Sequence, residues 1–220
     1  MAAFVFTTLV NGFFLDSISV GSASMEPTFA QGDRVLATPL LFGAGVPFTT
    51  LKLGKIRAPE RGELVVCSPP YYSESALQRV VDPFIDFFTL RRARNLGSGD
   101  TAWESARLIK RVIAVPGDTI LIDNFIAFIK PAGTGEFLNE RVLNHRQYSV
   151  TLTPLPMGWT PSQPFSGSMA PLTLGENEYF VLGDNRSQSH DSRHFGPIGD
   201  ENMLQKVIFR YFPLRKAGGV

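Results

Sequence analysis

The sequence has few of the residues on which common catalytic and metal sites depend. It contains one cysteine, Cys67, in 220 residues, so an internal disulfide and a cysteine cage for a metal are excluded. It contains three histidines, and none stands in the H-E-x-x-H spacing of a zinc protease. The 21 basic residues nearly balance the 20 acidic ones without a basic stripe. We therefore expect no metal, no cofactor and no nucleic-acid partner.

The apolar N-terminal segment is also short. Residues 2–15 carry no charge, but a membrane span needs roughly 20 residues. The segment has no basic start, and the bulky Phe13-Phe14-Leu15 ends it, unlike the small-residue cleavage site of a secretory signal. We interpret residues 1–15 as a partial membrane anchor, in a chain that starts late relative to the natural gene product. A buried strand or a secretory apolar region is the alternative.

Short apolar runs separated by Gly and Pro turns dominate the rest of the chain, which is typical of antiparallel β structure. We predict a mostly β fold with a catalytic β core over residues 16–118 and 180–214. An insertion at 70–106 interrupts this core, and residues 119–179 form a smaller inserted β subdomain. Within the insertion, apolar residues at helical spacing over 76–94 predict a short amphipathic helix. It packs on its own domain or lies at a membrane surface.

Two similar segments raise the question of a catalytic serine. "GSASMEPTF" at 21–29 and "SGSMAPLTL" at 166–174 each place a serine before a methionine and a proline two residues later. His190-Asp191-Ser192 contains the residue types of a serine protease triad. Adjacent strand residues point to opposite faces, however, so these three do not converge as local strand. The adjacent trio therefore does not favour a histidine triad, and another base has to be considered.

A lysine can act as that base if burial keeps it neutral. Lys110 lies in the apolar run Leu108-Ile109-Lys110-Arg111-Val112-Ile113. Strand alternation places Lys110 on one face with Leu108 and Val112, while Arg111 points the other way. An amine among apolar neighbours, with no adjacent acid, is suited to be a base of low pKa. The alternative is a lysine whose amine reaches solvent at a strand edge.

Four segments then carry a resemblance. "SVGSASMEPTF", "ERGELVVCSPP", "LIKRVIAVPGDTI" and "YFVLGDNRSQSHDSR" come in that order between Val20 and roughly Phe212. They resemble the successive motif boxes of the type I signal peptidases, membrane-bound Ser/Lys endopeptidases. The resemblance implies that Ser24 is the nucleophile and Lys110 the general base. Ser168 lies in a Pro- and Gly-rich loop before the last box and matches no catalytic group.

The resemblance also implies roles for the neighbouring residues. The Ser22 hydroxyl and the Ser24 N–H match the oxyanion hole, and Ser189 matches the residue that orients the lysine. Residues with a supporting role are Met25, Pro27, Gly183, Asp184, Asn185, Arg186, Asp191, Ser192 and Arg193, with Asp191 and Arg193 as an ion pair. Shallow substrate pockets would be lined by Ile18, Val20, Val66, Leu108 and Ile109. Two departures are Glu63, where Asp is usual, and Gly21, where Pro is usual.

The implied activity is removal of signal peptides from exported preproteins after Ala-x-Ala sites, through an acyl-enzyme. The partners would be preproteins and the lipid surface. The site would lie on the outer face of the cytoplasmic membrane. Two alternatives remain: a catalytically silent, membrane-tethered peptide-binding β-domain, and a self-cleaving repressor with a Ser/Lys site. The second normally carries a DNA-binding domain before its serine, for which the sequence before Ser24 is too short.

Overall fold

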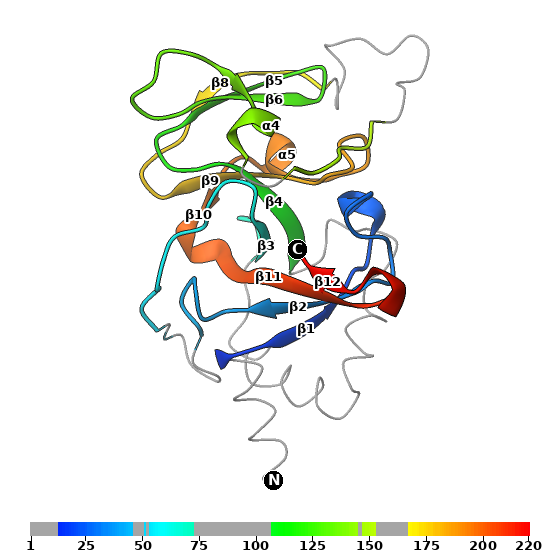
Figure 1. The fold of residues 1–220 in the computed structure, drawn as a ribbon. Coiled ribbons are helices and arrows are strands. Elements are labelled where there is room, and N and C mark those ends of the chain that lie inside the picture. The colour runs from blue at the N-terminus through cyan, green and yellow to red at the C-terminus, as the bar shows by residue number, and fades with distance from the viewer. Residues whose placement is uncertain (1–12, 46–50, 52, 73–106, 145–146, 153–166) are drawn as a thin grey trace.

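The computed structural model describes residues 13–45, 51, 53–72, 107–144, 147–152 and 167–220. These residues form two antiparallel sheets and a few short helical turns (Figure 1). The larger sheet has the strand order β1-β2-β11-β3-β4-β9-β10, with β12 also paired to β11. Its strands are β1 (Asp16–Ser19), β2 (Arg34–Thr38), β3 (Leu64–Cys67), β4 (Leu108–Ala114), β9 (Glu178–Leu182), β10 (Ile198–Gly199), β11 (Met203–Phe212) and β12 (Gly218–Gly219).

The smaller sheet has the order β7-β6-β5-β8. Its strands are β5 (Thr119–Asp123), β6 (Ile126–Lys130), β7 (Leu138–Asn139) and β8 (Met169–Thr173). The helical elements are η1 (Ala23–Met25), α4 (Glu140–Leu143), α5 (Ser192–Phe195), η3 (Asp200–Asn202) and η4 (Leu214–Lys216). The predicted mostly β, antiparallel fold is confirmed.

Residue choice explains the strands that form the core. All four residues of β3, Leu-Val-Val-Cys, are buried, because this central strand is covered on both faces by β-branched and aliphatic neighbours. Strand β5 alternates instead, with Ile120 and Ile122 buried and the residues between them more exposed. A two-residue turn at Asn124 and Phe125, both with positive φ, joins β5 to β6 and suits the twist of a hairpin.

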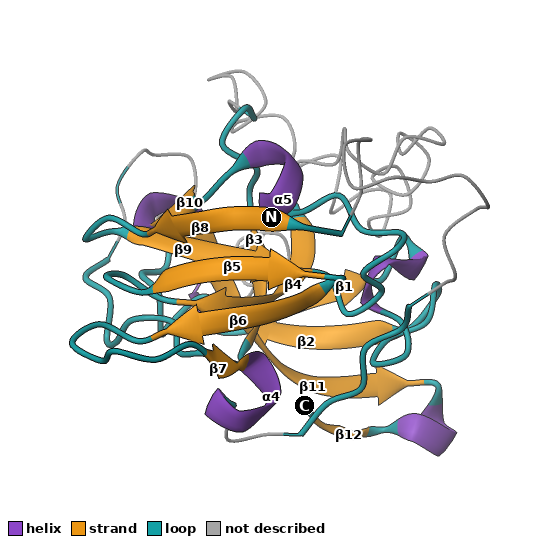
Figure 2. Cartoon of the chain, turned by 90° about the horizontal axis from the view of Figure 1, so that it is seen from above, coloured by secondary structure: helices purple, strands orange, loops and turns teal. Residues whose placement is uncertain are grey.

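The two sheets share one apolar layer. Ile113 and Ala114 of β4 and Phe180 and Leu182 of β9 pack with the inward residues of β5 and β6. Figure 2 shows β5 and β6 running side by side over the larger sheet. A second cluster lies around Val65, Cys67 and Val112, and a third lies around Val20, Met25 and Phe29. This layering places the smaller sheet against β4 and β9, the strands that carry the predicted lysine and lead into the last motif box.

Two sequence predictions of local structure were wrong. The stretch around Pro171 was expected to be a loop, but it contains β8, an edge strand where a residue without an N–H is tolerated. The polar segment 183–199, whose sequence predicts irregular structure, includes α5, because the Asp191 carboxylate caps its first turn.

Several predictions fall outside the described residues or are not tested by them. The expected helix at 76–94, most of the 70–106 insertion and most of the N-terminal segment lie outside that part of the chain. Where the structure is described, it contains no helix long and apolar enough to cross a membrane. The division into a core and an inserted subdomain stays a prediction.

Candidate active site

Ser24 lies in the short helical turn η1, between β1 and β2. Its neighbour Met25 is 1% exposed and packs with Val20 and Phe29, which anchors the turn to the core. The Phe29 N–H also donates to the Met25 carbonyl at 2.9 Å. Pro27 is exposed and follows a cis Glu26–Pro27 bond. The turn that carries Ser24 is therefore held in the core by Met25, while Pro27 lies at the surface.

Lys110 lies in the middle of β4 and reaches this serine. Its side chain is 2% exposed, and Nζ is 2.9 Å from Ser24 Oγ. The same nitrogen donates to Ser189 Oγ at 3.1 Å. The structure thus brings together three polar groups that the sequence separates by 86 and 79 positions.

The surroundings of Lys110 favour its neutral form. Burial lowers the pKa of the Lys110 amine below its ordinary value, and the nearby negative charge of Asp191 opposes this only partly. No carboxylate among the described residues forms a hydrogen bond with Nζ, whose partners are two hydroxyls. When the amine is neutral, the same 2.9 Å contact runs from the Ser24 hydroxyl to the nitrogen lone pair.

Ser22 adds a second hydroxyl to the serine. Its Oγ donates to Ser24 Oγ at 3.1 Å. The Ser24 N–H, which belongs to the first turn of a helical segment, has no protein acceptor within the described ranges. A hydroxyl and a backbone N–H are therefore available beside the same oxygen.

The segment from Gly183 to Arg193 packs directly against the dyad. A Cβ at Gly183 would lie 2.2 Å from Ser189 Oγ and 2.5 Å from the Ser24 carbonyl oxygen, so only glycine fits there. The Gly183 N–H donates to the Asp191 carboxylate at 3.0 Å, and Arg193 pairs with the same carboxylate at 2.8 Å. Burial alone would raise the pKa of Asp191, but Arg193 and the hydrogen bonds outweigh it and the pKa falls to about 2. The adjacent Ser192 hydroxyl accepts from the Val181 N–H inside the core.

Asn185 contacts the serine turn from this segment. Its N–H donates to the Ser24 carbonyl at 3.1 Å, and its side-chain Nδ2 donates to the Ala23 carbonyl at 3.2 Å. The side chain is 3% exposed. The peptide groups on both sides of the serine Cα are therefore fixed by one residue.

Sequence reasoning missed the partner of Arg111. Its guanidinium is buried and pairs with the Asp184 carboxylate at 2.8 and 2.6 Å, and Thr28 donates to that carboxylate at 2.5 Å. The sequence contained the information to predict this pair. A buried arginine needs a carboxylate partner, and Asp184 was already expected to have a supporting role.

Arg186 forms a second buried network that was not foreseen. It pairs with Glu140 of α4 at 2.6 Å and donates to the carbonyls of Phe125 and Gly183 at 3.0 and 2.9 Å. Tyr148 donates to the same Glu140 carboxylate. This network joins the smaller sheet to the segment that packs on Lys110.

The histidines do not form a triad. The rings of His190 and His194 stack at 4.9 Å, and His194 Nδ1 accepts from the Asp191 N–H. The Ser24 hydroxyl contacts Lys110 and Ser22, and no histidine in the described ranges contacts it. His145 lies outside those ranges. Those ranges also hold no group of His, Cys, Asp and Glu suited to a metal.

The expected substrate-pocket residues fall into two groups. Val20 and Val66 belong to one apolar cluster, with Ile18 and Ile109 packed against it. Leu108 belongs to a different cluster, because it lies on the opposite face of β4 from Ile109. By the same alternation Leu108 shares the face of Lys110, while Ile109 shares the face of Arg111. The five residues therefore do not form one continuous set.

The two departures from the motif pattern lie in different settings. Gly21 is exposed and has nothing within 4 Å of its Cβ direction. Glu63 precedes β3 and pairs with Arg57 and Lys206, each at 2.5 Å. Neither residue contacts the Ser24 or Lys110 side chain.

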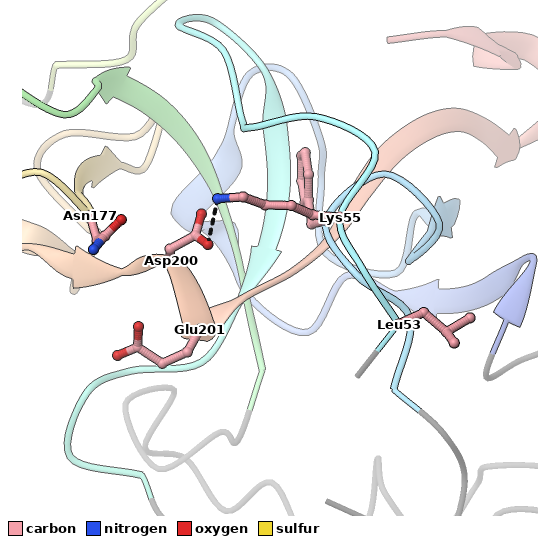
Figure 3. Close-up of a pocket in the computed structure, with 6 residues that line it drawn as sticks. Leu53, Lys55, Asn177, Asp200 and Glu201 are labelled. Atoms are coloured by element: carbon pink, nitrogen blue, oxygen red, sulfur yellow. Dashed lines mark hydrogen bonds and ion pairs between the residues drawn. The ribbon is translucent and has the colours of Figure 1, made fainter. Parts of the chain in front are cut away.

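A separate pocket of about 360 Å³ lies away from these residues (Figure 3). Lys55 reaches over it to Asp200, at 2.8 Å. The lining residues are Phe42, Leu53, Lys55, Asn177, Asp200 and Glu201. None of them belongs to the predicted site.

The motif order and the fold can now be set beside known proteins. The sequence profile described as "Signal peptidase, peptidase S26" matches residues 1–212. The chain belongs to this family. As a peptidase S26 member, it resembles "Signal peptidase I" of Rickettsia massiliae with 28% identity over 93% of this chain and 74% of the relative. It resembles "Probable signal peptidase I-1" of Synechocystis with 26% identity over 99% of this chain and 82% of the relative.

A solved structure also matches this peptidase S26 chain. It is a signal peptidase I from Enterococcus faecalis, with 22% identity over 68% of this chain and 96% of that one. The TM-score is 0.34. The resemblance to the signal peptidase family inferred from the four motif boxes is confirmed by the profile match.

Proposed function

We propose that this chain is a serine endopeptidase that cleaves signal peptides from exported preproteins with Ser24 as nucleophile and Lys110 as general base. One observation carries the proposal: the Lys110 amine is 2% exposed, lies 2.9 Å from the Ser24 hydroxyl, and has no hydrogen bond to a carboxylate among the residues that the structure describes. This is the arrangement of an activated nucleophile and its base. Family membership supports the choice of signal peptides as substrates.

The chemistry follows from these atoms. The neutral Lys110 amine takes the Ser24 proton as Oγ attacks the scissile carbonyl carbon. The Ser24 N–H and the Ser22 hydroxyl stabilise the oxyanion, a kind of interaction typically worth a few kcal/mol for each donor. The ammonium group then returns the proton to the leaving amine, which leaves an ester on Ser24. A water molecule, deprotonated by Lys110, hydrolyses this ester and restores both groups.

The lysine is held ready by Ser189. Its hydroxyl accepts one N–H of the amine at 3.1 Å, which leaves the lone pair directed to Ser24. Gly183 allows this approach because any side chain there would occupy the position of Ser189 Oγ. Burial supplies the neutral amine, and the Ser189 contact supplies its direction.

We also propose where the protein acts and what it selects. The substrate would lie as an added strand along the partly exposed Ile18 and Ile109, which pack on the buried Val20 and Val66. Bulky apolar walls of this kind would admit small residues such as the alanines of Ala-x-Ala. Because the apolar part of a signal peptide stays in the bilayer, the site would face the outer surface of the cytoplasmic membrane.

Cleavage of an Ala-x-Ala preprotein in detergent or lipid tests the proposal. Ser168 is exposed and directly precedes β8 of the smaller sheet. Ser168→Ala and wild type should therefore release the signal peptide at similar rates. Ser24→Ala should release none above background. Undiminished cleavage by Ser24→Ala would reject the proposal, and equal inactivity of all three proteins would favour a silent peptide-binding domain.

A further inference from the structure

The peptide group that carries the proposed oxyanion donor is itself held by a side chain. The Ser24 N–H shares one planar peptide unit with the Ala23 carbonyl. Only the Glu26–Pro27 and Phe212–Pro213 bonds are cis in the described part of the chain, so the Ala23–Ser24 unit is trans. In a trans unit the C=O and N–H point in opposite directions. Whatever fixes the Ala23 carbonyl therefore fixes the direction of the Ser24 N–H.

Asn185 provides that constraint. Its Nδ2 donates to the Ala23 carbonyl at 3.2 Å, and within the described part of the chain no acceptor competes for the Ser24 N–H on the other side. The backbone N–H of Asn185 separately holds the Ser24 carbonyl at 3.1 Å. The peptide before the serine thus depends on the Asn185 side chain, and the peptide after it depends on the Asn185 backbone.

The backbone around Asn185 is itself held by hydrogen bonds. The Asp184 carbonyl accepts from the Thr151 N–H at 2.9 Å, and the Arg186 N–H donates to the Thr151 carbonyl at 3.0 Å, which secures the chain on both sides of Asn185. The Asn185 Oδ1 is buried and has no hydrogen-bond partner among the described residues. The amide is therefore oriented by its Nδ2 contact alone, since an oxygen facing the Ala23 carbonyl would repel it.

We propose that Asn185 is a positioning residue that aims the Ser24 N–H at the oxyanion through the Ala23 carbonyl. It touches neither substrate nor the reacting oxygen and acts through one peptide plane. This inference rests on the proposed function, because it requires that an oxyanion forms beside Ser24. It gives the last motif box a second task, distinct from supporting Lys110 through Ser189.

Kinetics of Asn185→Ala test the role. The backbone bond to the Ser24 carbonyl survives in this variant, so the serine turn remains attached while the oxyanion peptide is freed. Complete loss of an oxyanion donor lowers kcat by about 10²–10³-fold, so loss of its orientation should lower kcat by roughly 10-fold or more with little change in KM. Asn185→Asp should lower kcat further than Asn185→Ala does, because a carboxylate oxygen then faces the Ala23 carbonyl oxygen. The matched control is Asn144→Ala, another buried amide with an unpartnered Oδ1, which contacts Tyr148 and not the dyad.

A ligand pair separates oxyanion binding from general damage. A peptide aldehyde ending in Ala-x-Ala forms a hemiacetal: Ser24 Oγ adds to the carbonyl carbon, its proton passes to Lys110, and the carbonyl oxygen becomes the oxyanion. The matching peptide alcohol cannot do so. Both ligands bind only folded protein, so the ratio of their Kd values does not depend on the folded fraction. We expect Asn185→Ala to reduce the preference for the aldehyde by roughly 10-fold, and Asn144→Ala to keep it.

The outcomes are distinguishable. If Ser24→Ala keeps cleavage and aldehyde preference, the proposed function itself fails. If Ser24→Ala loses both but Asn185→Ala behaves like Asn144→Ala, the function stands and the positioning role is overturned. Should circular dichroism show that Asn185→Ala does not fold, Asn185→Ser carries the same prediction, because its hydroxyl is too short to reach Ala23. Failure of both variants to fold would assign Asn185 to the fold and overturn the role.

Discussion

Lys110 and Arg111 are neighbours on β4, both are buried, and both are cations in water, yet their surroundings are opposite. Arg111 meets a carboxylate in a two-bond pair with Asp184 and lies 4.0 Å over the Tyr148 ring. Lys110 meets two hydroxyls and an apolar wall. Strand alternation sends them to different faces, so one strand carries an ion pair on one side and, on the other, the buried amine that we propose as the base. The partners of a buried cation, rather than its burial, decide its role.

The largest effect expected is on activity, from replacing the base. Lys110→Met should lower kcat/KM by about 10⁴-fold or more, and combining it with Ser24→Ala should add little, because the two act as one unit. Lys110→Arg should be equally inactive, because arginine keeps its charge in proteins. The kcat/KM values can be measured by preprotein cleavage, with enzyme concentrations high enough to detect slow turnover. Activity of Lys110→Arg near that of wild type would mean that a neutral amine is not needed.

The next largest effect is on stability, from breaking the pair on the other face. Arg111→Met leaves the Asp184 carboxylate buried with Thr28 alone, which should lower the free energy of unfolding by about 3–5 kcal/mol. Urea denaturation followed by fluorescence measures it. The control is the double variant Arg111→Met with Asp184→Leu, which removes both charges and should recover part of the loss. A single variant as stable as wild type would show that the pair contributes nothing.

Replacing Lys110 should raise the free energy of unfolding, whereas replacing Arg111 should lower it. Because burial lowers the folded-state pKa of Lys110, the unfolded chain binds a proton that the folded chain lacks between the folded and unfolded pKa values. The stability of wild type should therefore rise with pH through that window, by about 1.4 kcal/mol per unit from this group. Lys110→Met should be more stable than wild type below the window, and the difference should shrink as pH rises. Urea titrations at several pH values measure this, and a variant less stable at every pH would contradict it.

The smallest effect expected is from the histidines. Activity should rise with pH through the lowered pKa of Lys110, since only the neutral amine accepts the Ser24 proton. Burial also lowers the pKa of His190, but its ring stacks on His194 and does not reach Ser24. His190→Ala should therefore keep kcat/KM within about twofold and keep the same pH profile. A limb of the profile that disappears in this variant would identify histidine as the base.

The sequence contains enough to predict the dyad and most of its surroundings. Lys110 stands out because Leu108 and Val112, its neighbours on the same face of the strand, are apolar, and the motif order pairs it with Ser24. Strands β3 and β4 follow from their β-branched and aliphatic runs. These features are local or depend on residues placed in a recognisable order.

What could not be predicted depends on contacts between distant segments. Arg111 was expected to point away from Lys110, but its pairing with Asp184 requires the register of β4 against β9. The strand around Pro171 was missed because its edge position, which tolerates proline, is a property of the whole sheet. The capped turn α5 was missed because it has only four residues, too few to show an apolar periodicity in a polar segment. The separation of Leu108 from the other expected pocket residues likewise requires knowing which face of β4 covers which cluster.

Ser24, Lys110 and the residues that pack on them come from three distant segments: η1, β4 and the segment after β9. The last of these segments is synthesised only near the end of the chain. A chain still leaving the ribosome has its lysine in water, where an amine keeps its proton at neutral pH and cannot act as a base. On the proposed mechanism, Ser24 would be inactive until the segment that carries Gly183 and Ser189 packs against Lys110. Completion of the chain and formation of the active site would then be one event, and a copy in which this segment detaches would lose its activity.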